Sequence, residues 1–321
     1  MPMIQSLLIA NRGEIACRIV ATARVMGIET VTLFAGDDRD LPHAYAGDFS
    51  VALEGKGLAE TYLNIEKIIA AAKASGANAI HPGYGFLSEN AKFAEAVTKA
   101  GLIFVGPPAK VISMMGDKAE SRMMCQKIGV PTVPGYDGSA TDVKQLIKEA
   151  EKIGFPLLVK AAAGGGGKGM RIVHESKDVA AALESARSEA KNAFGDDRLL
   201  MEKYLTKPRH IEVQVIGDKH GNYVHLGERD CTIQRRRQKL IEETPSPLLT
   251  PHLRKKMGDA AVHLVKAAKY HTVGTVEFLL DEKRNFYFME VNTRIQVEHP
   301  VTELITGVDL IQWMIRIAMG E

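Results

Sequence analysis

The sequence predicts two parts of different fold class, an α/β part followed by an α+β part. Short apolar runs alternate with helical patterns from Ser6 to about Met114, which is typical of a parallel sheet covered by helices on both faces. A glycine-rich stretch at 161–173, AAAGGGGKGMRIV, lies between two apolar runs. From His210 onwards, closely spaced alternating runs indicate an antiparallel sheet.

Each element of the first part follows from its own pattern. SLLIA at 6–10 and ETVTLFA at 29–35 predict strands. Between them, apolar residues recur at helical spacing and predict a helix that ends at Gly27. The remaining elements expected here are a helix over 62–76, strands at 78–82 and 102–106, and a helix over Ala91–Ala100.

The second part begins with a helix over Asp117–Ile128. This helix ends in GVPTVPGYDG at 129–138, whose prolines and glycines predict a domain junction. The helices expected after it lie over Asp142–Ile153, near Lys177–Ala193, across Pro251–Tyr270 and over Gly307–Met319. The strands expected lie at 156–162, 170–173, 199–205, 210–218, 222–234, 274–281 and 285–292.

Bulk composition bounds the class of protein. The 321 residues carry 41 basic and 39 acidic side chains, a net charge of +2, which does not favour a nucleic-acid or membrane partner. No apolar run approaches the roughly 18 residues of a membrane span, and the N-terminus lacks the core of a signal peptide. Cys17, Cys125 and Cys231 are scattered, so we expect free thiols and a cytoplasmic location, or the mitochondrial matrix for a processed eukaryotic chain.

The most informative pattern is the hairpin at 275–292. A turn at 282–285 gives the register Asp281–Phe286, Leu279–Phe288, Glu277–Glu290 and Thr275–Asn292. Because side chains alternate faces along a strand, Glu277, Glu290 and Asn292 share one face. The apolar neighbours expected on the other face are Val276, Phe278, Met289 and Val291.

Carboxylates that face each other across a hairpin destabilise it unless a cation lies between them. Mg²⁺ (or Mn²⁺) suits oxygen ligands of this kind, so the hairpin predicts a divalent metal site. The alternative is a solvated face with two glutamates of no special role, since the pair effect is below about 1 kcal/mol.

The glycine stretch is a candidate phosphate site but not a P-loop, because Ala162 and Gly169 stand where that motif needs Gly and a hydroxyl residue. Consecutive glycines let backbone N–H groups approach phosphate oxygens, and Lys160 with Lys168 or Arg171 adds positive charge. The glycines concerned are Gly164, Gly165, Gly166, Gly167 and Gly169. A flexible surface hairpin is the alternative.

Three further segments carry weaker signals. MEKYL suits an adenine slot in which Met201 and Leu205 pack on the base, although a plain strand also explains it. QRRRQK, if it is a strand, places Arg235, Arg237 and Lys239 on one face and Arg236 on the other. We favour an anion site there over nucleic-acid binding, because no aromatic residue for base stacking lies nearby; a solvated basic edge is the alternative.

The third segment is NTRIQVEHP at 292–300. Arg294 can clamp a planar oxyanion with two hydrogen bonds. Glu298 is a candidate base with no neutralising neighbour in sequence, and His299 before Pro300 fits a structural role. Each of these residues, taken alone, also fits an ordinary surface position.

Together these segments resemble the ATP-grasp enzymes, and specifically the biotin carboxylase component of biotin-dependent carboxylases such as acetyl-CoA, propionyl-CoA or pyruvate carboxylase. The motifs that carry the resemblance are IANRGEIACRI, HPGYGFLSEN, GDK, KAAAGGGGKGM, MEKYL, PRHIEVQV, ERDCTIQRRRQK, VEFL and FMEVNTRIQVEHPVTE. The resemblance implies a Rossmann-like N-terminal domain over 1–114 and an ATP-grasp domain over 115–321. Within the latter, a glycine-loop lid subdomain would span about 132–204.

The resemblance also implies an activity, the ATP-driven carboxylation of biotin on a carrier protein. Bicarbonate would attack the γ-phosphate of ATP to give carboxyphosphate and ADP, and biotin N1′ would take the carboxyl group. The partners implied are a biotin carboxyl carrier protein, a carboxyltransferase and a second copy of the chain.

Site residues follow from the resemblance position by position. Lys118, Lys160 and the glycine loop would hold the nucleotide phosphates, with Glu202, Leu205, His210, Gln234 and Arg237 around the rest of the nucleotide. Glu277, Glu290 and Asn292 would hold Mg²⁺. Arg294, Gln296, Val297 and Glu298 would bind bicarbonate, with Glu298 as its base, Lys239 beside the carboxyphosphate and Tyr84 near the biotin ring.

Three positions depart from the family pattern. Arg237 stands where many members carry His, Ala163 replaces the first glycine of the lid, and Lys168 stands where Arg is frequent. Family members continue past the position of Glu321 with a domain that completes the adenine pocket, so for a chain that ends there we expect nucleotide binding with poor carboxylation. A nucleotide-binding fragment without turnover, or another ATP-grasp ligase that passes an acyl phosphate to an amine, is the alternative function.

Overall fold

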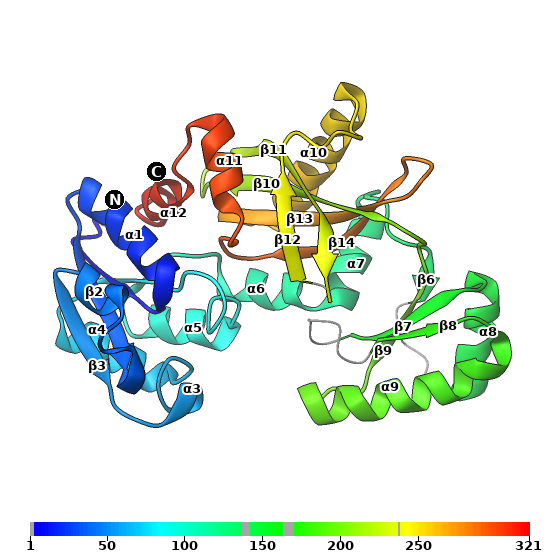
Figure 1. Ribbon diagram of the computed structural model, residues 1–321, viewed down its shortest axis with the longest axis horizontal. Helices are drawn as coiled ribbons and strands as arrows, with labels where there is room; N and C mark the ends of the chain where they lie inside the picture. Colours follow the sequence, from blue (N-terminus) through cyan, green and yellow to red (C-terminus); the bar gives the residue numbers. More distant parts are fainter. Residues whose placement is uncertain (1–2, 137–141, 163–169, 237) are drawn as a thin grey trace.

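The structure is a computed structural model that describes residues 3–136, 142–162, 170–236 and 238–321. Within these residues the chain forms three sheets that follow one another along the long axis of the molecule (Figure 1). A parallel sheet lies at one end, a five-stranded antiparallel sheet in the middle and a four-stranded antiparallel sheet at the other end. The expected change from a parallel first part to an antiparallel second part is therefore confirmed.

The parallel sheet has the strand order β3-β2-β1-β4-β5. Its strands are β1 (Ser6–Ile9), β2 (Glu29–Ala35), β3 (Phe49–Leu53), β4 (Ala79–His81) and β5 (Ile103–Phe104). Leu7 and Ile9 of β1 pack toward helices α1 (Gly13–Val25) and α12 (Leu310–Ala318), whereas Leu8 packs toward α4 (Ile65–Ala74) and α5 (Ala91–Lys99). Helices cover both faces, as expected, but one of them comes from the far end of the chain.

Several short elements were not predicted. Strand β3 was missed because its continuous apolar run covers only 51–53, and four of its five residues are at least partly exposed. The other unpredicted elements are η1 (Gly36–Asp38), α2 (Pro42–Ala46), α3 (Gly57–Glu60), α6 (Ala109–Gly116), β6 (Gly135–Tyr136), η2 (Ser176–Asp178), β12 (Gln238–Glu243) and α11 (His299–Thr306).

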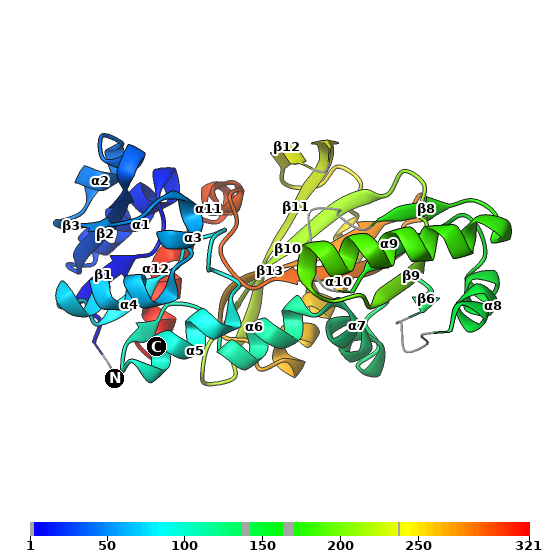
Figure 2. The same cartoon turned by 90° about the horizontal axis from the view of Figure 1, so that it is seen from below.

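The four-stranded sheet, with the order β6-β9-β7-β8, forms a small unit with two helices. Its elements are β6 (Gly135–Tyr136), α8 (Val143–Ile153), β7 (Leu157–Ala161), β8 (Arg171–Val173), α9 (Val179–Phe194) and β9 (Leu199–Lys203). Leu146 of α8, Leu183 of α9 and Val159 of β7 belong to one core cluster, so the unit has its own core. Figure 2 shows α9 lying along this sheet.

The middle sheet has the order β12-β11-β10-β13-β14. Its strands are β10 (Arg209–Gly217), β11 (Tyr223–Arg235), β12 (Gln238–Glu243), β13 (Thr272–Leu280) and β14 (Phe286–Asn292). Helix α10 (Pro251–Ala267) covers one face, where Met257 and Leu264 pack on Val213 and Val276. Helices α6 and α7 (Lys118–Lys127) contact β14 at the edge. The other face carries polar side chains.

The β13–β14 hairpin confirms the central part of the predicted register, since Glu277 pairs with Glu290 and Thr275 with Asn292. The outer pairs were wrong: Leu280 pairs with Phe286 and Phe278 with Phe288. A bulge between the two halves places one extra residue in β14. Consequently Phe288 joins the core cluster and Met289, expected there, is only partly buried outside it.

The basic run at 234–239 is not one continuous strand. Gln234 pairs with Lys239 and Arg235 with Gln238 across a tight turn in which Arg236 has a φ of 51°. The expected alternation of Arg235, Arg236 and Lys239 is therefore wrong, because the chain reverses direction between them. Arg237 lies outside the described residues.

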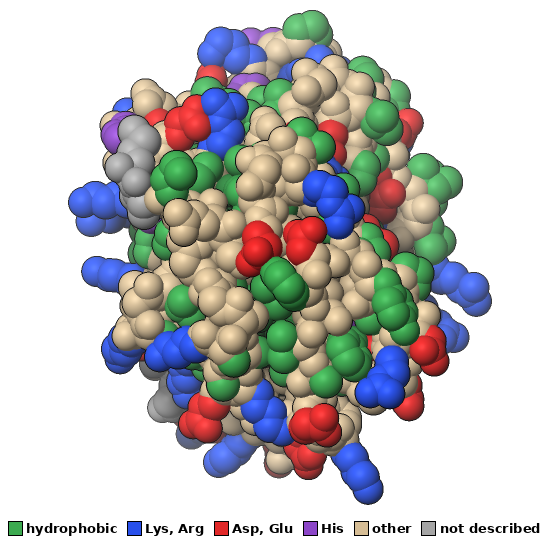
Figure 3. Space-filling view, turned by 90° about the vertical axis from the view of Figure 1, so that its left-hand side faces the viewer, with side chains coloured by type: hydrophobic (Ala, Val, Ile, Leu, Met, Phe, Trp, Pro, Cys, Tyr) green, Lys and Arg blue, Asp and Glu red, His purple; other side chains and the backbone are tan. Residues whose placement is uncertain are grey.

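The surface carries both charge types. On the end face that carries the N-terminal helices, basic and acidic side chains are interspersed (Figure 3). Among the residues that the structure describes, no helix is both long and apolar enough to span a lipid bilayer.

One backbone position carries strain that a substitution should relieve. Thr272 has a φ of 107° and is buried with an unpartnered hydroxyl, and a β-branched residue rarely adopts this conformation. We expect Thr272→Gly to raise the free energy of unfolding by about 1 kcal/mol, measured by chemical denaturation. Lys207→Gly, at an unbranched exposed residue with a φ of 49°, is the control and should change stability less. A lower stability of Thr272→Gly would contradict this reasoning.

Candidate active site

A row of charged side chains crosses the polar face of the middle sheet. Arg229 of β11 pairs with Glu212 of β10, Glu212 pairs with Glu277 of β13, and Glu277 pairs with Glu290 of β14. Because neighbouring register partners point to the same face, the four side chains form one line. The first three are buried, so their charges must be compensated by one another and by their neighbours.

Arg229 lies fully buried at one end of this row. Its guanidinium donates to Glu212 Oε1 at 2.6 Å, to Gln214 Oε1 and Thr302 Oγ1 at 2.7 Å, and to Gln296 Oε1 at 3.0 Å. These contacts tie β10, helix α11 and the segment after β14 to one rigid planar group on β11. Sequence analysis named neither Arg229 nor Glu212 as a site residue, although charged residues inside two apolar strand patterns were a signal.

Lys239 of β12 places its ammonium among three carboxylates. Nζ lies 2.5 Å from Glu212 Oε2, 2.6 Å from Glu298 Oε1 and 3.0 Å from Glu277 Oε1. Burial acts to lower the pKa of Lys239, but the three carboxylates outweigh it and raise the pKa. Lys239 is thus a fixed positive charge, and it is the neutralising neighbour of Glu298 that the sequence did not reveal.

Glu277 is surrounded by hydrogen-bond donors. Oε1 accepts from Asn292 Nδ2 at 2.8 Å and from Gln296 Nε2 at 3.0 Å, while His210 Nε2 lies 3.0 Å from Oε2 as an ion-pair contact. Burial acts to raise the pKa of Glu277, but His210 and Lys239 hold it well below its usual range. The same carboxylate acts on His210, whose pKa is raised despite the opposing effect of burial. Glu277 therefore stays ionised.

Glu290 is the accessible member of the carboxylate pair. Its side chain is 31% exposed, and Lys118 Nζ, from the first turn of α7, lies 3.3 Å from Oε2. Asn292 Oδ1 accepts from Arg294 at 3.0 Å. Two carboxylates and one amide oxygen on one face are the donor set that Mg²⁺ prefers, so these three residues fit a magnesium ion.

The segment after β14 supplies the remaining polar groups. Arg294 donates to Glu89 Oε2 at 2.9 Å, and Gln296 is held between Arg229 and Glu277. Val297 is 60% exposed, whereas Glu298 is buried against Lys239. Burial acts to raise the pKa of Glu298, but Lys239 outweighs it and lowers the pKa. His299 is buried and donates from Nδ1 to Gln296 O at 2.8 Å, which fits the structural role expected of it.

The small unit brings a second polar group toward this region. Glu202 of β9 contacts Lys160 Nζ of β7 at 2.5 Å and Arg122 of α7 at 3.1 Å. Met201, expected to pack on a base, is instead buried in the core of the unit, because successive residues of β9 point to opposite faces. Leu205 is partly exposed just after β9, and Gln234 Nε2 lies 3.3 Å from His210 Nδ1.

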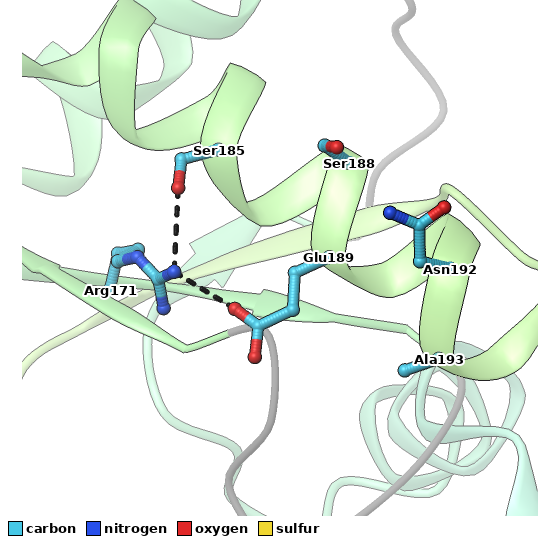
Figure 4. Close-up of a pocket in the computed structure, with 6 residues that line it drawn as sticks. All are labelled: Arg171, Ser185, Ser188, Glu189, Asn192 and Ala193. Carbon is cyan, nitrogen blue, oxygen red and sulfur yellow. Dashed lines mark hydrogen bonds and ion pairs between the residues drawn. The ribbon is translucent and has the colours of Figure 1, made fainter.

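The predicted phosphate loop falls on residues that the structure does not describe, namely Ala163, Gly164, Gly165, Gly166, Gly167, Lys168 and Gly169. Arg171, which follows it, does not support the expected phosphate contact. Its guanidinium donates to Glu189 at 2.9 Å and Ser185 at 3.4 Å on α9, beside an open depression of about 690 Å³ (Figure 4). Arg171 is committed to that helix.

The N-terminal part reaches the site through the loop that follows β4. Tyr84 in this loop donates from its hydroxyl to Glu14, and Glu89 contacts both Thr293 and Arg294. Sequence analysis named Tyr84 but not Glu89, since a lone glutamate in a loop gives no indication of a partner 205 residues away.

The chain matches two protein-family models. Residues 3–112 match the model described as the N-terminal domain of biotin carboxylase. Residues 117–321 match the model described as the ATP-binding domain of the carbamoyl-phosphate synthase L chain.

Curated relatives and solved structures agree with these models. The propionyl-CoA carboxylase alpha chain of Ruegeria pomeroyi is 53% identical over 99% of this chain and 47% of its own length. The mitochondrial methylcrotonoyl-CoA carboxylase subunit alpha of Mus musculus is also 53% identical, over 99% of this chain and 44% of its own length. The chain thus spans a little less than half of these relatives.

Two solved structures extend the comparison. A biotin carboxylase from Campylobacter jejuni, in a complex named β-γ-ATP, superimposes with a TM-score of 0.97 at 48% identity over 99% of this chain and 72% of that one. The second is the biotin carboxylase domain of Hydrogenobacter thermophilus 2-oxoglutarate carboxylase, a dimer in complex with MgADP, ADP and bicarbonate. It superimposes with a TM-score of 0.95 at 51% identity, over 100% of this chain and 71% of that one. The chain described here therefore belongs to the biotin carboxylase family.

Proposed function

We propose that this chain carboxylates biotin at the expense of ATP, with bicarbonate as the carboxyl donor. The observation that carries the proposal is the Lys239 ammonium held by the carboxylates of Glu212, Glu277 and Glu298. Glu277 also accepts from Asn292, and Asn292 accepts from Arg294. One site then offers a place for a metal-bound triphosphate and, next to it, a place for a small anion. The family relatives that bind MgADP and bicarbonate support this assignment.

Phosphoryl transfer asks the protein chiefly for positioning and for charge compensation. Lys118 and Lys160 would contact the nucleotide phosphates. On nucleotide binding, Lys118 would leave Glu290 and Lys160 would leave Glu202. Glu202, Leu205, His210 and Gln234 would surround the adenine and ribose. When Mg²⁺ is bound at Glu277, Glu290 and Asn292, it supplies charge neutralisation for the phosphates.

Bicarbonate would bind at the segment after β14. The free N–H groups of Arg294 and the backbone of Val297 would hold its oxygens, and Glu298 would accept its proton as the oxygen attacks the γ-phosphate. Lys239 would then screen the negative charge of carboxyphosphate. Biotin would approach from the side of Tyr84, carried by a biotin carboxyl carrier protein whose partner carboxyltransferase uses the product, and a homodimer is proposed for the assembled enzyme.

The test is the release of ADP from ATP with and without bicarbonate and free biotin. We expect ADP release that requires bicarbonate and is stimulated by biotin. Release that ignores bicarbonate, or that needs an amine acceptor, would contradict the proposal and favour another ligase.

The metal site gives a separate prediction. Glu290→Gln removes one negative ligand, and we expect the Mg²⁺ concentration for half-maximal ADP release to rise by at least about ten-fold. Glu282→Gln, at the exposed turn of the same hairpin, is the matched control and should leave this concentration unchanged. An unchanged Mg²⁺ requirement in Glu290→Gln would remove this residue from the metal site.

A further inference from the structure

Glu89 connects the parallel sheet to the segment where the proposed function places bicarbonate. We propose that Glu89 is a positioning residue that fixes the guanidinium of Arg294 for anion binding. This inference rests on the proposed role of Arg294, and it assigns a function to a residue outside the ATP-binding part of the chain.

The carboxylate of Glu89 makes contacts with both its oxygens. Oε1 accepts from the backbone nitrogen of Thr293 at 3.0 Å and from its hydroxyl at 3.3 Å, and Oε2 accepts from Arg294 Nε at 2.9 Å. One side chain therefore fixes the backbone at the exit of β14 and the first nitrogen of the guanidinium. The Arg294 backbone and side chain are restrained together.

The other contacts of Arg294 leave part of the guanidinium available. One terminal nitrogen donates to Ile295 O at 3.1 Å and the other to Asn292 Oδ1 at 3.0 Å. A guanidinium has five N–H donors. The residues that the structure describes use three of them, which leaves one N–H on each terminal nitrogen for a planar oxyanion to accept. The Glu89 side chain is 40% exposed, so water screens its charge and the positive charge of Arg294 persists.

The loop that carries Glu89 is held in place along its length. Asn11 Nδ2 donates to Pro82 O at 2.8 Å and to Tyr84 O at 2.7 Å. A Cβ at Gly83 would approach Asn11 to 3.0 Å, so this close contact needs glycine, which also has a φ of 64°.

The middle of the loop is fixed by aromatic contacts. Phe86, with a φ of 42°, stacks on Tyr62 at 5.1 Å, and the Arg12 guanidinium lies 5.6 Å from both rings. Arg12 in turn is paired with Asp38 at 3.0 Å. The loop is therefore a rigid arm from the parallel sheet, and a rigid arm can impose a geometry on Arg294.

The experiment compares Glu89→Ala and Glu89→Gln with Glu95→Gln, a control at an exposed ion pair on α5. For Glu89→Ala we expect the KM for bicarbonate to rise about ten- to hundred-fold while the KM for ATP stays within about two-fold. Glu89→Gln keeps one acceptor oxygen and should recover part of this loss. Parallel changes in both KM values, or a lower melting temperature without the selective rise, would overturn the proposal in favour of a purely structural contact.

A second measurement separates this inference from the proposed function. If the unmodified chain shows no bicarbonate-dependent ADP release, the proposed function fails. The position of the Arg294 guanidinium in crystals of Glu89→Ala still decides whether Glu89 fixes that guanidinium. A displaced or disordered guanidinium supports the positioning role. An unmoved guanidinium overturns it.

Discussion

Glu298→Gln is expected to lower kcat for bicarbonate-dependent ATP cleavage by a factor of about 10²–10⁴, the usual contribution of a positioned general base. The amide keeps the size of the side chain and can still contact Lys239, but it cannot take the proton of bicarbonate. ATP binding, measured by calorimetry, should change little, because Glu298 lies in the segment proposed to bind bicarbonate and not among the residues proposed to bind the nucleotide. A variant with normal turnover would exclude Glu298 as the base.

The pH profile gives the same prediction a second readout. Because Lys239 lowers the pKa of Glu298, this carboxylate is ionised at every pH above the usual pKa of a glutamate. A loss of activity at higher pH must therefore come from the titration of other groups. Removal of the ammonium in Lys239→Gln raises that pKa, so the acid limb of kcat/KM should move to higher pH. Glu243→Gln, at an exposed residue of β12, should leave the limb in place.

Arg229→Met is expected to give the largest loss of stability, about 3–5 kcal/mol, because it removes one partner of a buried ion pair. Of its ion-pair partners among the described residues, Glu212 would keep only Lys239, and Gln214, Gln296 and Thr302 would each lose a donor. Chemical denaturation measures the loss. Arg24→Met, at a 60% exposed residue that lies 3.9 Å from Asp48, is the control and should cost less than about 1 kcal/mol.

The stability loss in Arg229→Met should depend on pH with a defined sign. Burial raises the pKa of Glu212, and Arg229 opposes that effect. Without Arg229 the pKa of Glu212 in the folded state rises further above its value in the unfolded state. The variant therefore loses stability relative to the parent chain as pH rises from the unfolded to the folded pKa of Glu212. It regains this stability as pH falls below the unfolded pKa. A difference in stability that does not shrink on acidification would mean that lost packing, rather than the buried charge, explains the effect.

Most of the fold was predictable because most elements bury a regular apolar pattern. Helix α1 shows this, since its buried residues repeat at the period of a helix, and strand β13 is a short run that is buried almost throughout. Elements such as β3 and α11 could not be found in this way, because few of their residues are buried.

The site was predictable only where one hairpin determines it. The Glu277–Glu290 pair follows from local register, and the bulge at Met289 left it intact. The roles of Arg229 and Glu89 depend on contacts across strands and across parts of the chain, which a local pattern does not encode. The contact of Lys239 with Glu298 joins two motifs that the sequence presented separately.

Helix α12 has a consequence for how the molecule is made. Its residues Ile311, Met314 and Ile315 share a core cluster with Leu7 and Ile9 of β1, so the strand at 6–9 waits for a helix at 310–318. Until α12 has been synthesised, the side of the parallel sheet that also carries α1 is only partly covered and prone to aggregation, which is the state that chaperones recognise. The order in which the two family segments are translated is therefore not the order in which they can finish folding.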